Sequence, residues 1–230
     1  MDKGKNVKKL LAALTLCSLA TVSWANEHLD RISSAAERMD AFDPNEWTFK
    51  AETTKAEEIW LGWFDPTQDP VWQLSSVDGK SPTQDQVDTY LEEMREGTDS
   101  EEDEDTFLEF ISPESLKLTE QKGHLFTYQF KPIFKEFSKK NRERVQGEFV
   151  YNSELDIIQR LTFSNTKPIK FAGGAAKLEK FHMEMTFTLI GGKVFLDTAK
   201  EEMNGKFAFV KSFEENKFSK YYDAEFIVTN

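Results

Sequence analysis

The sequence predicts a mainly β protein with a few helices, an α+β class in which one curved antiparallel sheet or half-open barrel dominates. Apolar residues recur at every second position through most of the chain, as they do in strands with one buried face. Turn-like residues separate these segments at short intervals, which favours an antiparallel meander. Only two segments have the apolar spacing of an amphipathic helix.

The first 25 residues predict a secretory signal peptide. Four lysines precede an apolar run at residues 10–20 that is too short to span a bilayer, and a small-residue pattern ends at Ala25. We therefore expect export to the periplasm and a single β-rich domain at residues 26–230. A lipoprotein signal with Cys17 as the lipidated residue fits less well, because the bulky Leu16 precedes this cysteine.

A helix and three strands are predicted for the first part of this domain. Residues 26–43 have apolar side chains at helical spacing, and Pro44 ends the helix because proline cannot continue it. The apolar period then changes to two. Strands are therefore predicted at residues 47–51, 57–66 and 71–77, with a turn at Asp78-Gly79.

The second predicted helix has the clearest start signals in the chain. Ser81 is the expected N-cap, Pro82 the first helical residue and Gln84 the partner of Ser81 in a capping box. The helix is expected to end at Met94. Residues 96–105 then form an acidic, mobile loop. Calcium binding by this loop stays open, although it lacks the spacing of an EF-hand.

The rest of the chain is predicted to be a series of strands joined by tight turns. Turns are expected at residues 121–123, 152–154, 191–192, 204–205 and 214–216. The strands are expected at residues 107–111, 115–120, 124–132, 146–152, 156–165, 177–190, 193–203, 205–213 and 220–228.

The segment at residues 180–189 is the clearest amphipathic strand. Its apolar side chains fall on odd positions and are predicted to face inward, whereas His182 and Glu184 face outward. The inward residues are Phe181, Met183, Met185, Phe187 and Leu189. The pattern leaves open whether this face fills a core or lines a place where an apolar molecule binds.

Composition and motifs argue against several classes of function. A formal net charge of −12 disfavours a nucleic-acid partner, because such binding depends on phosphate neutralisation. No cysteine remains after Cys17, and the three histidines belong to no metal or nucleophile motif. We expect no enzyme activity, no catalytic residues, no bound metal and no cofactor. We also expect no transmembrane segment.

One basic segment interrupts this acidic chain. Residues 131–144 contain six Lys or Arg against Glu136 and Glu143, interleaved with aromatic and aliphatic side chains. This segment is expected to be a solvated connection between two strands. Contact with lipid headgroups or with an acidic partner is the alternative.

Aromatic residues are unusually frequent, with 20 Phe, 5 Trp and 5 Tyr. Two helices are too few to cover a sheet of eight or more strands, and uncovered apolar area usually marks a binding site. Methionine suits such a site because its side chain adapts to its partner. Packing of the aromatic residues against one another in a closed core stays open as the alternative. The candidate ligand-binding residues are Trp47, Phe49, Phe126, Tyr128, Phe130, Phe149, Tyr151, Phe181, Met183, Met185, Phe187, Phe207 and Phe209.

Three stretches carry a resemblance to a known family: "FDPTQDPVWQLSSVDGKSPTQDQVDTY", "TKPIKFAGGAAKLEKFHMEMTF" and "GKFAFVKSFEENKFSKYYD". They resemble an uncharacterised family of exported proteins from Gram-negative proteobacteria. The resemblance covers most of residues 47–223, but "KFAGG" replaces the more usual Phe-Gly form. The order of helices and strands also resembles the outer-membrane lipoprotein carrier superfamily. That resemblance implies a half-open barrel whose concave apolar face holds acyl chains.

These observations predict a periplasmic, non-enzymatic binding protein for a lipid, an acyl chain or another apolar ligand of the cell envelope. The expected partner is a lipid or an acylated protein. The alternative is a periplasmic interaction or scaffold protein that keeps a closed core and binds another envelope protein.

Overall fold

The computed structural model describes most of the domain, at residues 30–98, 106–135, 137–171, 175–207 and 211–227. The predicted signal peptide and the part of the acidic loop at residues 99–105 lie outside the described residues, so the structure does not address them.

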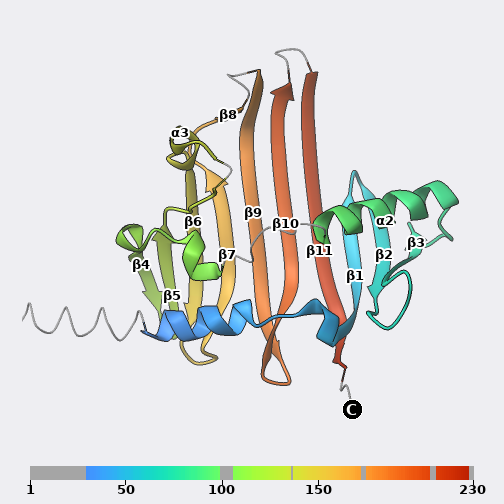
Figure 1. Cartoon of the computed structure of the whole chain (residues 1–230), viewed down its shortest axis with the longest axis horizontal. Helices are drawn as coiled ribbons and strands as arrows, with labels where there is room; N and C mark the ends of the chain where they lie inside the picture. Colours follow the sequence, from blue (N-terminus) through green and yellow to red (C-terminus); the bar gives the residue numbers. More distant parts are fainter. Residues whose placement is uncertain (1–29, 99–105, 136, 172–174, 208–210, 228–230) are drawn as a thin grey trace, which may run out of the picture.

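Eleven strands form one antiparallel sheet that is curved and does not close (Figure 1). Its order is β3-β2-β1-β11-β10-β9-β7-β6-β5-β4, and β8 pairs with β9 outside this path. The prediction of a mainly β fold with a curved antiparallel sheet is confirmed. The strands are β1 (Trp47–Lys55), β2 (Glu58–Phe64), β3 (Trp72–Val77), β4 (Lys117–Lys122), β5 (Leu125–Phe130), β6 (Val145–Asn152), β7 (Ile157–Asn165), β8 (Ile169–Phe171), β9 (Ala176–Ile190), β10 (Lys193–Phe207) and β11 (Lys211–Phe226).

The sheet is a meander except at one junction, where the first strand pairs with the last. Residues from Trp47 to Lys55 of β1 pair with residues from Phe226 to Lys217 of β11. The three N-terminal strands therefore extend the sheet beyond its C-terminal strand. The unpaired edges are β3 and β4.

Short helices complete the described part of the chain. A helix at residues 30–40 crosses the strands near one side of the sheet, and α2 (Gln84–Thr98) lies on the other side (Figure 1). None of the helices within the described residues is long and apolar enough to cross a membrane. The remaining helices are α3 (Lys139–Arg142) and the 3-10 helices η1 (Pro44–Glu46), η2 (Phe107–Phe110) and η3 (Pro113–Ser115).

The second helix starts and ends later than the sequence predicts. The capping box is formed by Thr83 and Gln86: the Gln86 N–H donates to Thr83 Oγ1 over 3.3 Å, and the Thr83 N–H donates to Gln86 Oε1 over 2.9 Å. The predicted box of Ser81 and Gln84 was therefore placed two residues too early. Residues 96–98 continue the helix, so only residues beyond Thr98 belong to the loop.

The segment predicted as a strand at residues 107–111 is instead the 3-10 helix η2. Thr106 and Glu109 form a capping box at its start, and the Phe107 N–H also donates to Asp40 Oδ1 over 2.9 Å. These local hydrogen bonds satisfy backbone donors that a strand would have paired across the sheet. Phe107 still becomes part of the core, because the helical turn points its ring inward.

Two predicted turns near the C-terminus are wrong, because β10 and β11 run through them. Asn204 and Gly205 lie inside β10, and residues 214–216 lie inside β11. A Cβ at Gly205 would overlap the Lys177 carbonyl oxygen and lie 2.7 Å from the Phe213 ring, so this glycine permits close strand packing. The turn at Gly191-Gly192 is confirmed, with φ of +59° and +83°.

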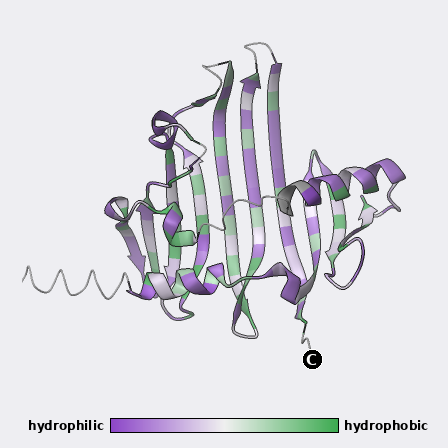
Figure 2. Ribbon diagram, in the orientation of Figure 1, coloured by the Kyte–Doolittle hydropathy of each residue, from purple (hydrophilic) through white to green (hydrophobic). Residues whose placement is uncertain are grey.

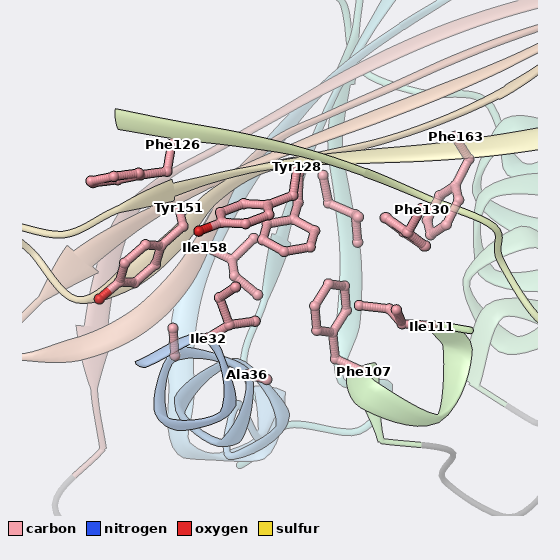
Figure 3. Close-up of a cluster of buried hydrophobic side chains, with 13 residues drawn as sticks. Ile32, Ala36, Phe107, Ile111, Phe126, Tyr128, Phe130, Tyr151, Ile158 and Phe163 are labelled. Atoms are coloured by element: carbon pink, nitrogen blue, oxygen red, sulfur yellow. The ribbon is translucent and has the colours of Figure 1, made fainter. Parts of the chain in front are cut away.

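The largest core cluster lies between the helix at residues 30–40, η2 and the strands β5, β6 and β7. Figure 3 shows Ile32 and Ala36 of the helix pointing toward aromatic rings of the sheet, with Phe107 beside them. The Tyr128 and Phe149 rings stack with centroids 5.1 Å apart. Its fully enclosed members are Ile32, Ala35, Ala36, Phe107, Ile111, Phe126, Tyr128, Phe130, Phe149, Tyr151, Ile158, Leu161 and Phe163.

Two smaller clusters lie at the other side of the sheet. One joins Trp47, Phe49, Phe64 and Phe195 at the lower end of β1, β2 and β10. The other joins Trp60 and Val77 to Tyr90 of α2. The interior is thus divided into separate packed regions.

Alkaline pH is expected to destabilise this fold. Burial raises the pKa of Tyr128 to about 12, and burial together with the hydrogen bond to Asp156 raises that of Tyr151 to about 12. Between pH 10 and 12 the folded chain keeps these protons and the unfolded chain loses them. The free energy of unfolding should therefore fall as pH rises through this window, by up to about 1.4 kcal/mol per pH unit for each phenol.

Urea unfolding at pH 8, 10 and 11 measures this effect, and absorbance at 295 nm follows phenolate formation. Tyr128→Phe removes one of the two groups and should make the pH dependence shallower. A free energy of unfolding that stays constant from pH 8 to 11 would contradict the account.

Candidate functional site

A single row of directly paired residues crosses ten strands of the sheet. Directly paired residues share a face, and both the helix at residues 30–40 and α2 contact members of this row. We call this face the helix-bearing face. From β4 to β3 the row is Leu118, Tyr128, Phe149, Leu161, Met185, Ala199, Ser219, Thr53, Trp60 and Val77.

Burial varies along this row: Leu118 at the β4 edge, Met185 and Ala199 are half-buried, whereas the other seven members are buried. Phe149 is fully enclosed and Leu161 is 4% exposed beneath the helix at residues 30–40, and Trp60 is buried beneath α2. Met185 and Ala199, which lie between them, are only half-buried. The neighbouring row behaves in the same way, because Phe163 is buried but its partner Met183 is half-buried.

These half-buried residues form a continuous strip along the two longest central strands. Each is directly paired with another member across β9 and β10: Phe181 with Met203, Met183 with Glu201, and Met185 with Ala199. We call these six residues the β9–β10 strip. In Figure 2, green apolar bands recur along the same strands, alternating with purple polar ones.

The structure places the candidate residues predicted from sequence in three different environments. Phe187 lies half-buried at the end of the strip nearest the core, and Leu189 is also half-buried. Phe207 is 51% exposed and packs on Phe213 with ring centroids 5.0 Å apart; Phe209 lies outside the described residues. The residues enclosed in packed clusters are Trp47, Phe49, Phe126, Tyr128, Phe130, Phe149 and Tyr151.

The outward residues of β9 behave differently from the strip. His182 pairs with Glu202 and Glu184 pairs with Lys200, so the opposite face of the same strands is polar. Glu202 lies between Lys180 and Lys200, whose hydrogen bonds lower the pKa of its carboxyl to about 2. The alternation expected from sequence thus separates an apolar face from a charged one.

One carboxylate lies inside the strip. Burial raises the pKa of Glu201, and the nearby Glu215 carboxylate raises it further, whereas Lys217 lowers it. Glu201 and Lys217 are directly paired across β10 and β11. The apolar strip therefore ends, on the side toward α2, at a polar rim able to orient a polar headgroup.

Helix α2 is held over β1–β3 by one ion pair and a small apolar cluster. Lys55 Nζ lies 2.6 Å from Glu93 Oε1 of α2 and 3.9 Å from the centroid of the Trp60 ring. Tyr90 lies on Gly62, where a Cβ would overlap the Tyr90 hydroxyl. The absence of a side chain at this glycine lets the helix approach the sheet closely.

The Tyr90 hydroxyl is buried and accepts or donates no hydrogen bond within the described part of the chain. An unpaired buried hydroxyl costs about 1–3 kcal/mol relative to one exposed to water. The unpaired hydroxyl therefore offsets part of the free energy that the Tyr90 ring gains by packing between α2 and the sheet.

A buried polar group near α2 was not predicted from sequence. Thr53 Oγ1 and Ser219 Oγ lie 2.9 Å apart at the junction of β1 and β11. Burial raises the pKa of Tyr221. No local pattern signals this group, because it depends on pairing between strands 166 residues apart.

Comparison with known proteins identifies no relative, so the site is interpreted from its geometry. No protein-family model, curated protein or solved structure matches this chain. Within the described ranges, no three His, Cys, Asp or Glu side chains are arranged to hold a metal ion.

Replacement of the unpaired hydroxyl provides a first test of the α2 contact. Tyr90→Phe is expected to leave the free energy of unfolding unchanged or raise it by about 1 kcal/mol, because it removes a buried group without a partner. Tyr151→Phe is the matched control: it loses a 2.8 Å hydrogen bond to Asp156 and should cost about 1 kcal/mol. Urea unfolding compares the two variants. A larger loss in Tyr90→Phe than in Tyr151→Phe would contradict the assignment.

Crowding at Gly62 provides a second test. Gly62→Ala should displace Tyr90 and make amides of α2 exchange with deuterium about tenfold faster or more, while amides of β6 and β7 keep their protection. Gly147→Ala is the control, because its Cβ would overlap the Phe130 ring in the other cluster. Equal α2 exchange in Gly62→Ala and the unmodified protein would show that this helix does not depend on the close contact.

Proposed function

We propose that this protein binds one acyl chain, or another elongated apolar ligand, along the β9–β10 strip, without catalysing a reaction. The observation that carries the proposal is the partial exposure of Met183, Met185 and Met203, of which the first two pack against the edge of the cluster beneath the helix at residues 30–40. Apolar side chains in such a position gain about 25 cal/mol for each Å² that a ligand removes from water.

The shape and chemistry of the strip support a flexible, elongated ligand. The strip begins at Phe181 on β9 and Phe187 continues the same face beyond Met185, so six residue steps of about 3.3 Å, or roughly 20 Å, separate the two rings. Methionine side chains between these rings adapt readily to a mobile alkyl chain. Glu201 and Lys217 at the rim offer a carboxyl and an ammonium group to a polar headgroup.

Helix α2 supports the proposal as a cover that opens. Its contact with the sheet includes the ion pair of Lys55 with Glu93 and, among the described residues, the buried Tyr90 hydroxyl without a hydrogen-bond partner. The unpaired hydroxyl lowers the free energy that opposes opening. A ligand that enters beside α2 also gains burial from the half-covered strip, so opening and binding reinforce one another.

The architecture is consistent with a carrier-like role in the cell envelope. A curved antiparallel sheet that does not close, with helices on one face, supports the proposal, because the order of helices and strands resembles that of the lipoprotein carrier superfamily. The basic and apolar N-terminal segment supports export to the periplasm. A lipid or an acylated protein is the partner that this location and this strip favour.

A chain-length series of fatty acids tests the proposal directly. Fluorescence titration with a dye-labelled fatty acid, competed by saturated acids of increasing length, should give an affinity that rises about fourfold per added methylene, equivalent to about 0.8 kcal/mol. The gain should stop when the chain exceeds the strip. An affinity independent of chain length would contradict apolar binding, and a stoichiometric protein partner with no lipid would favour the scaffold alternative.

Two variants on the same strand locate the binding face. Met183→Gln with Met185→Gln should weaken binding about tenfold or more, because buried amides would lack hydrogen-bond partners. Glu184→Gln changes the opposite face of β9 and should leave affinity within about twofold. Equal weakening by both changes would contradict binding on the helix-bearing face.

A further inference from the structure

A basic pocket lies near the upper end of β8, β9 and β10, close to α3 (Figure 1). Its volume is about 600 Å³. The chain as a whole has a formal net charge of −12, yet residues 131–180 contain eleven Lys or Arg against six Asp or Glu. The charged residues that line the pocket are Arg144, Lys167, Lys170, Lys177, Lys206 and Glu179.

Strand register places three of these lysines side by side. Lys170 of β8 is directly paired with Lys177 of β9, and Lys177 is directly paired with Lys206 of β10. Like charges in directly opposite positions destabilise a sheet. Among the described residues, only Lys177 of the three has a carboxylate partner, Glu179 at 2.8 Å. The arrangement retains a local excess of positive charge that a bound anion would offset.

Two asparagines fix the backbone that carries the cations. The buried Asn141 side chain donates to the Lys170 carbonyl oxygen over 2.8 Å and accepts from the Lys170 N–H over 3.3 Å. The Asn165 side chain donates to the carbonyl oxygens of Lys167 and Glu179, over 3.2 and 3.0 Å. The pocket is therefore held by hydrogen bonds between α3, β7, β8 and β9.

Arg144 brings a second kind of donor to the same place. One Nη1 hydrogen bond to the Pro168 carbonyl oxygen holds its guanidinium group against the pocket wall. The remaining N–H groups of a guanidinium suit oxyanions with several acceptor oxygens. A single carboxylate from the protein, Glu179, is already engaged with Lys177.

We propose that this pocket binds a phosphate group, either as free phosphate or as the headgroup of a phosphorylated lipid. A phosphate offers up to two negative charges and several oxygens, enough to contact Arg144 and the lysine row together. The site is distinct from the β9–β10 strip, and its occupation does not depend on an acyl ligand.

Calorimetric titration of the full chain with inorganic phosphate at low ionic strength tests the first source. Lys170→Gln with Lys206→Gln should weaken binding at least tenfold. Lys50→Gln with Lys220→Gln removes the same charge away from the pocket and should change binding less than twofold. Equal losses in the two double variants would overturn the proposal, because they would indicate attraction by overall charge alone.

Cosedimentation with vesicles tests the second source. Binding to phosphatidylglycerol vesicles but not phosphatidylcholine vesicles, lost in Lys170→Gln with Lys206→Gln and retained in the control variant, would identify an anionic lipid headgroup. Phosphate binding without vesicle binding would identify free phosphate. Absence of both would overturn the proposal.

Thermal unfolding checks that the pocket variant folds. Without phosphate its Tm should equal or exceed that of the unmodified protein, because like charges have been removed from directly opposite positions. Phosphate should raise the Tm of the unmodified protein and leave that of the variant unchanged. An equal phosphate-induced rise in both proteins would contradict the site.

Discussion

The pairing of β1 with β11 is the constraint on which the rest of the structure depends. It joins the three N-terminal strands to the long C-terminal meander and places Thr53 beside Ser219 in a buried hydrogen bond at the junction. Without that pairing, Trp60 and Val77 would not share a face with Leu161 and Met185. The register therefore decides that both helix-covered clusters lie on one side of a single sheet.

That arrangement explains why the middle of the sheet differs from its two sides. The helix at residues 30–40 contributes Ile32, Ala35 and Ala36 to one cluster, and α2 contributes Tyr90 to another. The β9–β10 strip stays half-buried, so its residues are more exposed than those beneath the two helices. Because apolar side chains that remain in water forgo the free energy of burial, the apolar ligand that we propose would stabilise the protein as it completes the cover. The opposite face of the same strands is charged and needs no cover.

Much of the fold could be predicted from local patterns, whereas the site could not. The alternation of Phe181, Met183 and Met185 indicated the correct face of β9, because side chains alternate regardless of tertiary context. The turn predicted at residues 204–205 was wrong. Gly205 is required because a side chain there would clash with a neighbouring strand, and the chain does not reverse direction at this residue. Most of the candidate aromatic residues lie enclosed in packed clusters, since their burial depends on helices and strands distant in sequence. The lysine row emerged only from strand register.

We propose that an apolar ligand completes the strip on the helix-bearing face. Native mass spectrometry of the protein purified gently from a cell-envelope extract tests it most directly. The account predicts a one-to-one adduct with the mass of a lipid or fatty acid, which extraction with organic solvent removes and added lipid restores. Protein that is consistently free of any adduct, and stays so after incubation with lipid, would contradict it.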